Sequence, residues 1–323
     1  MEKKYKVLVV YFSQTGRTKD VLDTFLAALR AQEHIDLDIA RVETESPFPY
    51  PWPMFEMLSI FPETVWEEPI PIKAPAFDEN TKYDLVILGC QIWFLSPSLP
   101  ISSVLHDPRK SKVFSGTPVV PIMTFRRSVS QGLEDLEKTL KGLGAVVIGK
   151  ISMQVLDKIS NPQFKELRHK RLPEGEKEWI LDKEELALIG RMGMQLAQSL
   201  EQIKRDPNSF AFKECCTILL PAGDPRKKMP KKVEEWVYRF TKKQKKKYLR
   251  WGKYIKEHSD VGTRKRRFYI IALSPLYIPI VYFFLPFAIL IKFVISLIIA
   301  ILKLPLLPFR LLKRGKAKSS GEQ

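Results

Sequence analysis

A strand–turn–helix unit near the start of the chain constrains the fold most. An apolar run over residues 7–12 leads into the turn Ser13-Gln14-Thr15-Gly16-Arg17-Thr18. Apolar residues then recur at helical spacing: Val21, Leu22, Phe25, Leu26 and Leu29. Hydroxyl and backbone N–H groups at a helix N-terminus bind phosphate, and the helix dipole favours its negative charge. The turn lacks the Gly-Lys-Ser/Thr ending of a P-loop and the three spaced glycines of a dinucleotide fingerprint, so a phosphate monoester fits it best. The alternative is that Ser and Thr only cap the helix.

This turn resembles the first loop of the flavodoxin family, which reads Ser/Thr-x-Thr-Gly-x-Thr and surrounds the phosphate of FMN. The resemblance implies FMN as the cofactor, bound where the strand order of a doubly wound sheet reverses. The residues that it assigns to FMN binding are Ser13, Gln14, Thr15, Gly16, Arg17 and Thr18.

A second apolar run, Tyr83–Phe94, predicts another buried strand that runs into a turn beginning at Gly89. In flavodoxin-like proteins the corresponding loop carries Gly-x-x-x-Trp and flanks the flavin ring, so Trp93 is expected to stack on it. The alternative is that Trp93 packs in the core. The residues assigned to the cofactor from this loop are Cys90, Gln91, Ile92, Trp93 and Phe94.

Strand and helix patterns alternate through residue 206. Further strands are expected at 37–42, 117–124 and 145–151, and helices at 129–143 and 186–203. This alternation predicts an α/β fold with a parallel sheet covered on both faces. We therefore expect residues 1–206 to form a flavodoxin-like, doubly wound, five-stranded parallel sheet that binds FMN.

Two segments depart from a plain flavodoxin. The proline-rich segment, residues 46–75, contains eight prolines and six aromatic residues, which predicts an extended excursion. It is expected to be either a strap over a helix layer or a lid over a lipophilic pocket. The second departure is the sequence Thr124-Phe125-Arg126-Arg127 after the fourth strand. Thr124, Phe125 and Arg126 are assigned to the cofactor, with the alternative that the arginines are a solvated pair.

Charge divides the chain. Residues 207–323 hold 26 Lys and Arg against 7 Asp and Glu, whereas residues 1–206 hold 27 against 29. Residues 268–291 form a run of 24 uncharged residues, long enough to cross a bilayer as a helix. We expect a membrane anchor over 268–309, as a hairpin or one to two short helices, followed by a basic cytoplasmic tail over 310–323. Basic residues flank the run on both sides, which places the flavodoxin-like domain on the cytoplasmic side of the membrane.

The segment 207–267 is expected to be a basic amphipathic linker next to the membrane. Within it, residues 231–257 place aromatic and lysine side chains at helical spacing, a pattern typical of contact with anionic lipid. Nucleic-acid binding is the alternative for such a lysine cluster, and the adjacent apolar run favours lipid.

The cysteine and histidine spacing predicts no metal site, and no catalytic acid or base stands out. A closer resemblance exists to the bacterial dialkylresorcinol condensing enzymes. It is carried by the N-terminal strand and turn, the Pro-Phe-Pro-x-Pro-Trp stretch and Phe61-Pro62-Glu63-Thr64-Val65. That resemblance implies flavin-dependent oxidation of a lipophilic substrate, a dialkyl cyclohexanedione, to a resorcinol. The alternatives are a membrane-tethered electron carrier and a binding module without flavin.

Overall fold

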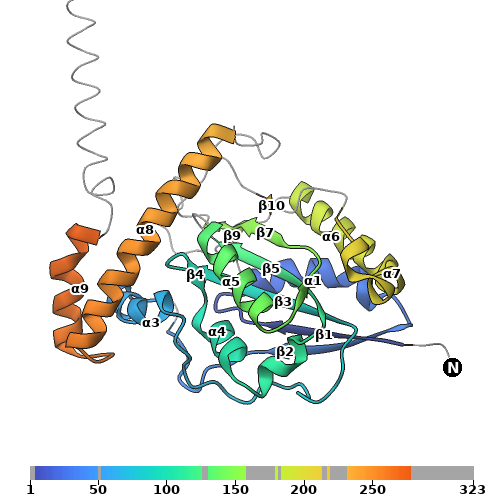
Figure 1. Ribbon diagram of the computed structural model, residues 1–323, viewed down its shortest axis with the longest axis horizontal. Helices are drawn as coiled ribbons and strands as arrows, with labels where there is room; N and C mark the ends of the chain where they lie inside the picture. Colours follow the sequence, from blue (N-terminus) through green and yellow to red (C-terminus); the bar gives the residue numbers. More distant parts are fainter. Residues whose placement is uncertain are drawn as a thin grey trace, which may run out of the picture. The chain divides into compact units, whose positions relative to one another are not determined.

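The computed structural model describes residues 4–49, 52–125, 130–157, 179–180, 183–212, 217–218 and 231–277. A predominantly parallel sheet lies at the centre of this part of the chain (Figure 1). The spatial order of its strands is β10 (Thr217–Ile218), β7 (Ile151–Gln154), β5 (Pro118–Phe125), β3 (Leu85–Trp93), β1 (Tyr5–Tyr11) and β2 (Ile35–Arg41). Numbered along the chain, the five main strands have the order 2-1-3-4-5 of flavodoxin-like folds. The predicted parallel α/β sheet is confirmed.

The sheet is larger than the five strands expected. The short strand β10 extends one edge beside β7, and β4 (Ser96–Pro97) and β6 (Val146–Val147) pair with β3 and β5. A separate antiparallel pair joins β8 (Leu156–Asp157) to β9 (Trp179–Ile180). The strand expected at 145–151 is divided at Gly149, where an added Cβ would lie 2.7 Å from the Phe212 ring. Both β6 and β7 still pair with β5.

Both faces of the sheet are covered by helices, as the near-continuous apolar strands require. On one face, α1 (Arg17–Arg30), α6 (Lys183–Gln198) and α7 (Leu200–Arg205) pack on Val7, Val9 and Ile87. On the other, α4 (Leu99–His106) and α5 (Ser130–Gly142) pack on Leu8, Val10 and Leu88. The predicted helix 186–203 is two helices, because the α-helical run ends at Gln198 and resumes at Leu200.

The proline-rich segment was expected to be extended, and this is wrong in its middle. It contains α2 (Met54–Ser59) and α3 (Phe61–Val65). Proline is compatible with a helix start, where its missing N–H is not needed. Accordingly, Pro53 immediately precedes α2, and Pro62 lies in the first turn of α3.

The basic segment after residue 230 forms α8 (Lys231–His258), followed by α9 (Arg264–Tyr277). Helix α8 packs on α3 and α5, and the compact unit extends to Ile270 (Figure 1). Residues 231–270 therefore belong to the same compact unit as the sheet and are not an extended connection. Phe61, which is 1% exposed, packs on Trp251 and Tyr248 of α8.

Arg266 of α9 also contacts the proline-rich segment. Its guanidinium donates to the Ser59 carbonyl at 2.9 Å and forms an ion pair with Glu63 at 2.8 Å. This arginine is 2% exposed, so the pair is largely desolvated. The start of α9 is thereby fixed to the proline-rich segment.

The expected membrane anchor lies mostly outside the described residues, which end at Tyr277. Among the helices that the structure describes, none combines the length and apolar character needed to cross a bilayer.

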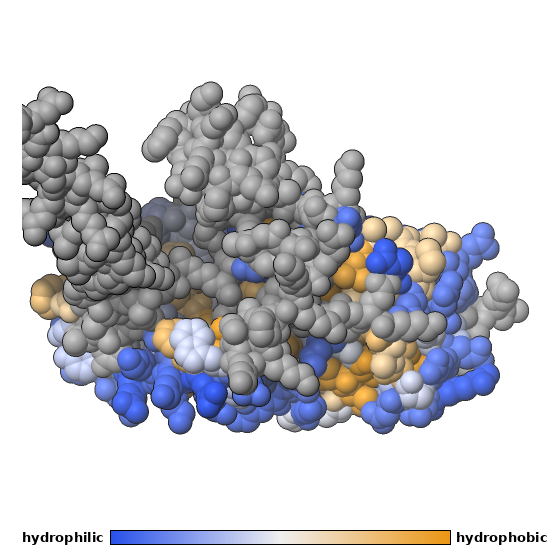
Figure 2. Space-filling model, turned by 90° about the horizontal axis from the view of Figure 1, so that it is seen from above, coloured by the Kyte–Doolittle hydropathy of each residue, from blue (hydrophilic) through white to orange (hydrophobic). Residues whose placement is uncertain are grey.

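On the face seen in Figure 2, hydrophilic residues form much of the margin. Apolar residues show between them, toward the side that α6 and α7 occupy in Figure 1.

Candidate functional site

The loop between β1 and α1 has the geometry of an anion site. Gly16 adopts φ 88°, a left-handed conformation that glycine tolerates best, and α1 begins at the next residue without a side-chain cap. The Oγ1 atom of Thr15 is buried and has no hydrogen-bond partner among the described residues. Since buried polar groups are normally paired, Thr15 has the capacity to bind a ligand atom at this helix N-terminus.

Two neighbouring hydroxyl groups hold this loop in place. Ser13 Oγ accepts a hydrogen bond from the Lys19 backbone N–H at 3.3 Å. Thr18 Oγ1 lies 2.8 Å from Thr124 Oγ1, and this buried contact joins the start of α1 to the end of β5. Thr18 and Thr124 therefore act within the protein, whereas Thr15 is the threonine of this loop left with a buried, unpaired hydroxyl oxygen.

The predicted turn at Gly89 is wrong, because β3 continues through this residue to Trp93. An added Cβ at Gly89 would lie 2.6 Å from the side chains of Leu22 and Tyr11, so packing against α1 and β1 explains the glycine. Cys90 and Gln91 are consequently strand residues. Cys90 is fully buried beside Ser98, and burial raises the pKa of its thiol to about 12. Gln91 lies beside Thr124 in the register, and its Oε1 is buried without a partner within the described part.

The actual turn after β3 is formed by Phe94 and Leu95. Both have positive φ, 48° and 65°, and they connect Trp93 to Ser96 across an antiparallel pair. A type I′ turn requires positive φ at both central residues, which are therefore usually Asn and Gly. With Phe and Leu the turn is strained, and such strain is concentrated at functional sites.

Trp93 lies in an aromatic cluster with Phe12, Phe48 and Trp52. Its ring centroid is 5.7 Å from that of Phe12, 5.4 Å from Phe48 and 5.0 Å from Trp52, all at steep angles. Phe48 and Trp52 belong to the proline-rich segment, and Gln14 Nε2 donates to the Pro49 carbonyl at 3.3 Å. The segment therefore covers both the β1–α1 loop and the end of β3.

The remaining residues that the sequence assigned to the cofactor lie in different environments. Ile92 is partly buried against the core and contacts the start of α5 near Gly132. Phe125 is 3% exposed, and its carbonyl accepts from the Val155 N–H at 2.9 Å, so it is part of the sheet. Arg17 lies at the first position of α1. Arg126 lies outside the described residues.

These residues fit the phosphate of FMN. The loops after β1 and β3 separate at the switch point of the strand order, where doubly wound sheets bind ligands. Thr15 and Gln91 supply buried polar atoms there, and the cluster around Trp93 supplies an apolar wall. The β1–α1 loop and the turn after β3 follow neighbouring strands, whereas Cys90 and Phe125 lie within the sheet.

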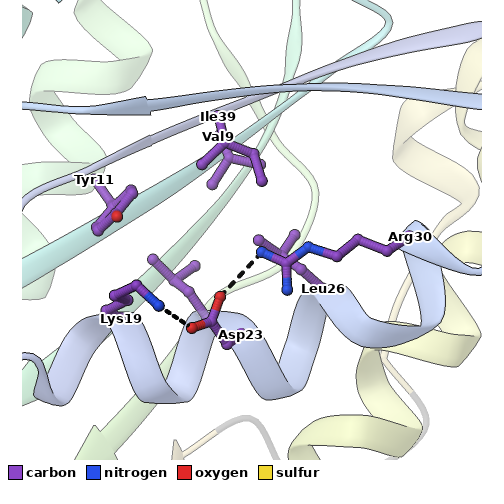
Figure 3. A pocket seen from close by; sticks show the side chains of 8 residues that line it. Val9, Tyr11, Lys19, Asp23, Leu26, Arg30 and Ile39 are labelled. Atoms are coloured by element: carbon purple, nitrogen blue, oxygen red, sulfur yellow. Dashed lines mark hydrogen bonds and ion pairs between the residues drawn. The ribbon is translucent and has the colours of Figure 1, made fainter.

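A second concavity, of about 120 Å³, lies between α1 and the strands β1 and β2 (Figure 3). Asp23 lies at its centre, paired with Lys19 and with Arg30, whose Nη2 is 3.0 Å away. Burial alone would raise the pKa of Asp23, but the hydrogen bonds from Lys19 and Arg30 lower it overall. Ligand pockets are usually several times larger, so this cavity does not suit a flavin.

Sequence reasoning missed Lys245 of α8, which reaches the turn after β3. Its Nζ donates to the Leu95 carbonyl at 3.4 Å and to Ser96 Oγ. The residue stands in the run Lys242-Lys243-Gln244-Lys245-Lys246-Lys247, where the other lysines are exposed. Lys245 lies one helical turn after Thr241, which is also buried, and this shared helical face was the available signal.

No protein-family model matches the chain, and no curated protein matches it. A flavoprotein in complex with FMN from Lactobacillus acidophilus NCFM is similar in structure. It is 20% identical, with 46% of this chain and 93% of that chain covered and a TM-score of 0.37. Oxidised flavodoxin 1 from Bacillus cereus is 12% identical, with 61% and 97% covered and a TM-score of 0.34. The flavodiiron protein from Giardia intestinalis is 14% identical, with 63% and 38% covered and a TM-score of 0.38.

These likenesses are distant and cover part of the chain. The flavodoxin-like fold assignment therefore rests on the strand order, the parallel register and the β1–α1 loop of this molecule.

Proposed function

We propose that this chain is an FMN-binding oxidoreductase of the flavodoxin type. The observation that carries the proposal is the buried, unpaired hydroxyl of Thr15 beside the left-handed Gly16, at the N-terminus of α1. This start of α1 lies at the switch point between β1 and β3, where a doubly wound sheet binds its ligand. A phosphate group would satisfy the hydroxyl and the adjacent backbone N–H groups together.

The roles of the residues follow from their positions. Thr15 Oγ1 donates to a phosphate oxygen, and the start of α1 supplies N–H groups and a favourable dipole. Gln91 offers a buried acceptor beside Thr124 for a hydroxyl of the cofactor. Water is excluded from the side of the site that would hold the isoalloxazine ring by the cluster of Phe12, Phe48, Trp52 and Trp93. When bound, FMN supplies one-electron and hydride transfer.

For the reaction, we infer oxidation of a dialkyl cyclohexanedione to a dialkylresorcinol. The support is the sequence resemblance together with the aromatic side chains of the proline-rich segment beside Trp93, which suit alkyl chains. A membrane-tethered electron carrier is the second candidate. The observation that favours it is that Phe48 and Trp52 pack directly on Trp93 and so cover the Trp93 side of the proposed flavin site.

Membrane attachment is part of the proposal, with the flavin domain facing the cytoplasm. Its support is the uncharged run 268–291 and the basic residues on both sides of it. On α8, Trp236 and Phe240 stack on one another and are 60% and 39% exposed, among lysines that attract anionic lipid. The other aromatic residues expected on a lipid-facing side, including Trp251 and Tyr248, instead face α3.

Replacing Thr15 tests the phosphate site. Thr15→Ala is expected to weaken FMN binding by about 10- to 150-fold, because a hydrogen bond to a charged group contributes about 1.5–3 kcal/mol. Thr24→Ala is the matched control, because it removes a hydroxyl from within α1, where Thr24 donates to the Asp20 carbonyl one turn before it. Titration of the apoprotein with FMN by fluorescence measures both. Equal affinity of the two variants would remove Thr15 from the site.

The reaction is tested by anaerobic mixing of the FMN-loaded protein with a dialkyl cyclohexanedione. The expected result is loss of the oxidised flavin absorption with formation of an equimolar amount of resorcinol. If the flavin stays oxidised with every dione but is reduced readily by a cellular flavin reductase, the electron carrier is the correct function.

A further inference from the structure

Strained backbone is concentrated near one side chain, that of Lys245. Among the described residues, the non-glycine positions with positive φ are Glu67 at 54°, Phe94 at 48° and Leu95 at 65°. Glu67 lies in the turn that ends α3, and the other two form the turn after β3. Such conformations cost free energy and persist where the surroundings hold them.

Lys245 supplies part of that restraint. Its ammonium donates to the Leu95 carbonyl and to Ser96 Oγ, and it forms an ion pair of 2.8 Å with Asp135 of α5. The Lys245 side chain is 10% exposed and Ser96 is fully buried. One buried cation therefore joins α8, α5 and the strained turn.

Glu67 is a further charged residue whose carboxyl interacts with Lys245. Partial burial of its carboxyl raises its pKa, and the positive charge of Lys245 acts in the opposite direction. Asp135, His106 and Lys138 also act on Glu67, the first raising its pKa and the other two lowering it. A buried lysine is stable only with such partners, because an unpaired charge is costly to desolvate.

We propose that Lys245 is a positioning residue for the wall of the flavin site: by fixing the Phe94–Leu95 turn, it makes cofactor binding depend on α8. The proposal rests on the proposed FMN function, since this turn follows Trp93 at the ring side of the site. Lys245 itself lies behind the turn and acts through it. Helix α8 thereby becomes part of the cofactor site.

The test compares Lys245→Met with Lys246→Met in the full chain. The two variants remove the same group from adjacent positions, one buried and one exposed. Lys245→Arg retains the charge and donors. Ser96→Ala removes one acceptor and leaves Lys245 paired with Asp135, and it replaces Lys245→Met should that variant fail to fold. Hydrogen exchange of residues 92–98 in the apoprotein and FMN affinity are measured for each.

The proposal expects faster exchange over 92–98 in Lys245→Met and Ser96→Ala, but not in Lys246→Met. It also expects FMN binding about tenfold weaker or more in Lys245→Met, with partial recovery in Lys245→Arg. The visible circular dichroism of any bound flavin should change most in Lys245→Met, less in Lys245→Arg and not in Lys246→Met. If wild-type protein binds no FMN, the proposed function fails, and exchange alone decides whether Lys245 holds the turn. Unchanged exchange, or faster exchange with unchanged FMN affinity in a chain that binds FMN, overturns the proposal.

Discussion

A chain that ends after Pro230, before α8, is expected to lose the folded state of its proline-rich segment. In the full chain Phe61 and Val65 of α3 are 1% and 2% exposed because α8 covers them. Uncovering each of these side chains costs about 1.5–3 kcal/mol. The loss is a large part of the about 5–15 kcal/mol that stabilises a typical domain.

The effect is measured by thermal unfolding and by limited proteolysis, with a chain that ends after Tyr277 as the control. The shorter chain should melt at a lower temperature and be cleaved rapidly between residues 52 and 72, whereas the control should resist. Equal melting temperatures and equal protease resistance would mean that α8 contributes nothing to the domain.

Gly193→Ala is expected to destabilise the domain by about 3 kcal/mol, at the upper end of overpacking effects. Gly193 lies where α6 crosses α1, and an added Cβ would lie 2.0 Å from the Phe25 carbonyl oxygen. A backbone oxygen cannot move aside as a flexible side chain would, so the two helices must separate.

Gly190 of the same helix provides the matched control, since nothing lies within 4 Å of an added Cβ there. Gly190→Ala should stabilise the protein by about 1 kcal/mol through helix propensity. Urea unfolding of both variants is therefore expected to shift the midpoint in opposite directions. A rise in both midpoints would contradict the close α1–α6 packing.

The sheet was predictable because its central strands β3 and β5 are nearly continuous apolar runs, a pattern that a parallel sheet buried on both faces requires. The β1–α1 loop was also predictable, since hydroxyl groups and Gly16 stand directly between a strand and a helix. Gly89 was misread because a glycine after an apolar run usually marks a turn, whereas here it makes room for Leu22.

The role of α8 was not predictable from its pattern. An apolar stripe beside lysines is typical of a helix on a lipid surface and equally of a helix packed on its own domain. Trp251 and Ile255 are buried, which shows that the later part of this stripe faces the domain. Lys245 was hidden in a lysine-rich run, because its burial depends on α5 and on the turn after β3.

The most direct test of FMN binding is the visible absorption spectrum of the full chain purified in detergent, followed by identification of the released ligand. The β1–α1 loop predicts an oxidised flavin spectrum and release of FMN in an amount equimolar with the protein, with no FAD. Protein that is colourless as purified and leaves the fluorescence of added FMN unchanged would contradict FMN binding.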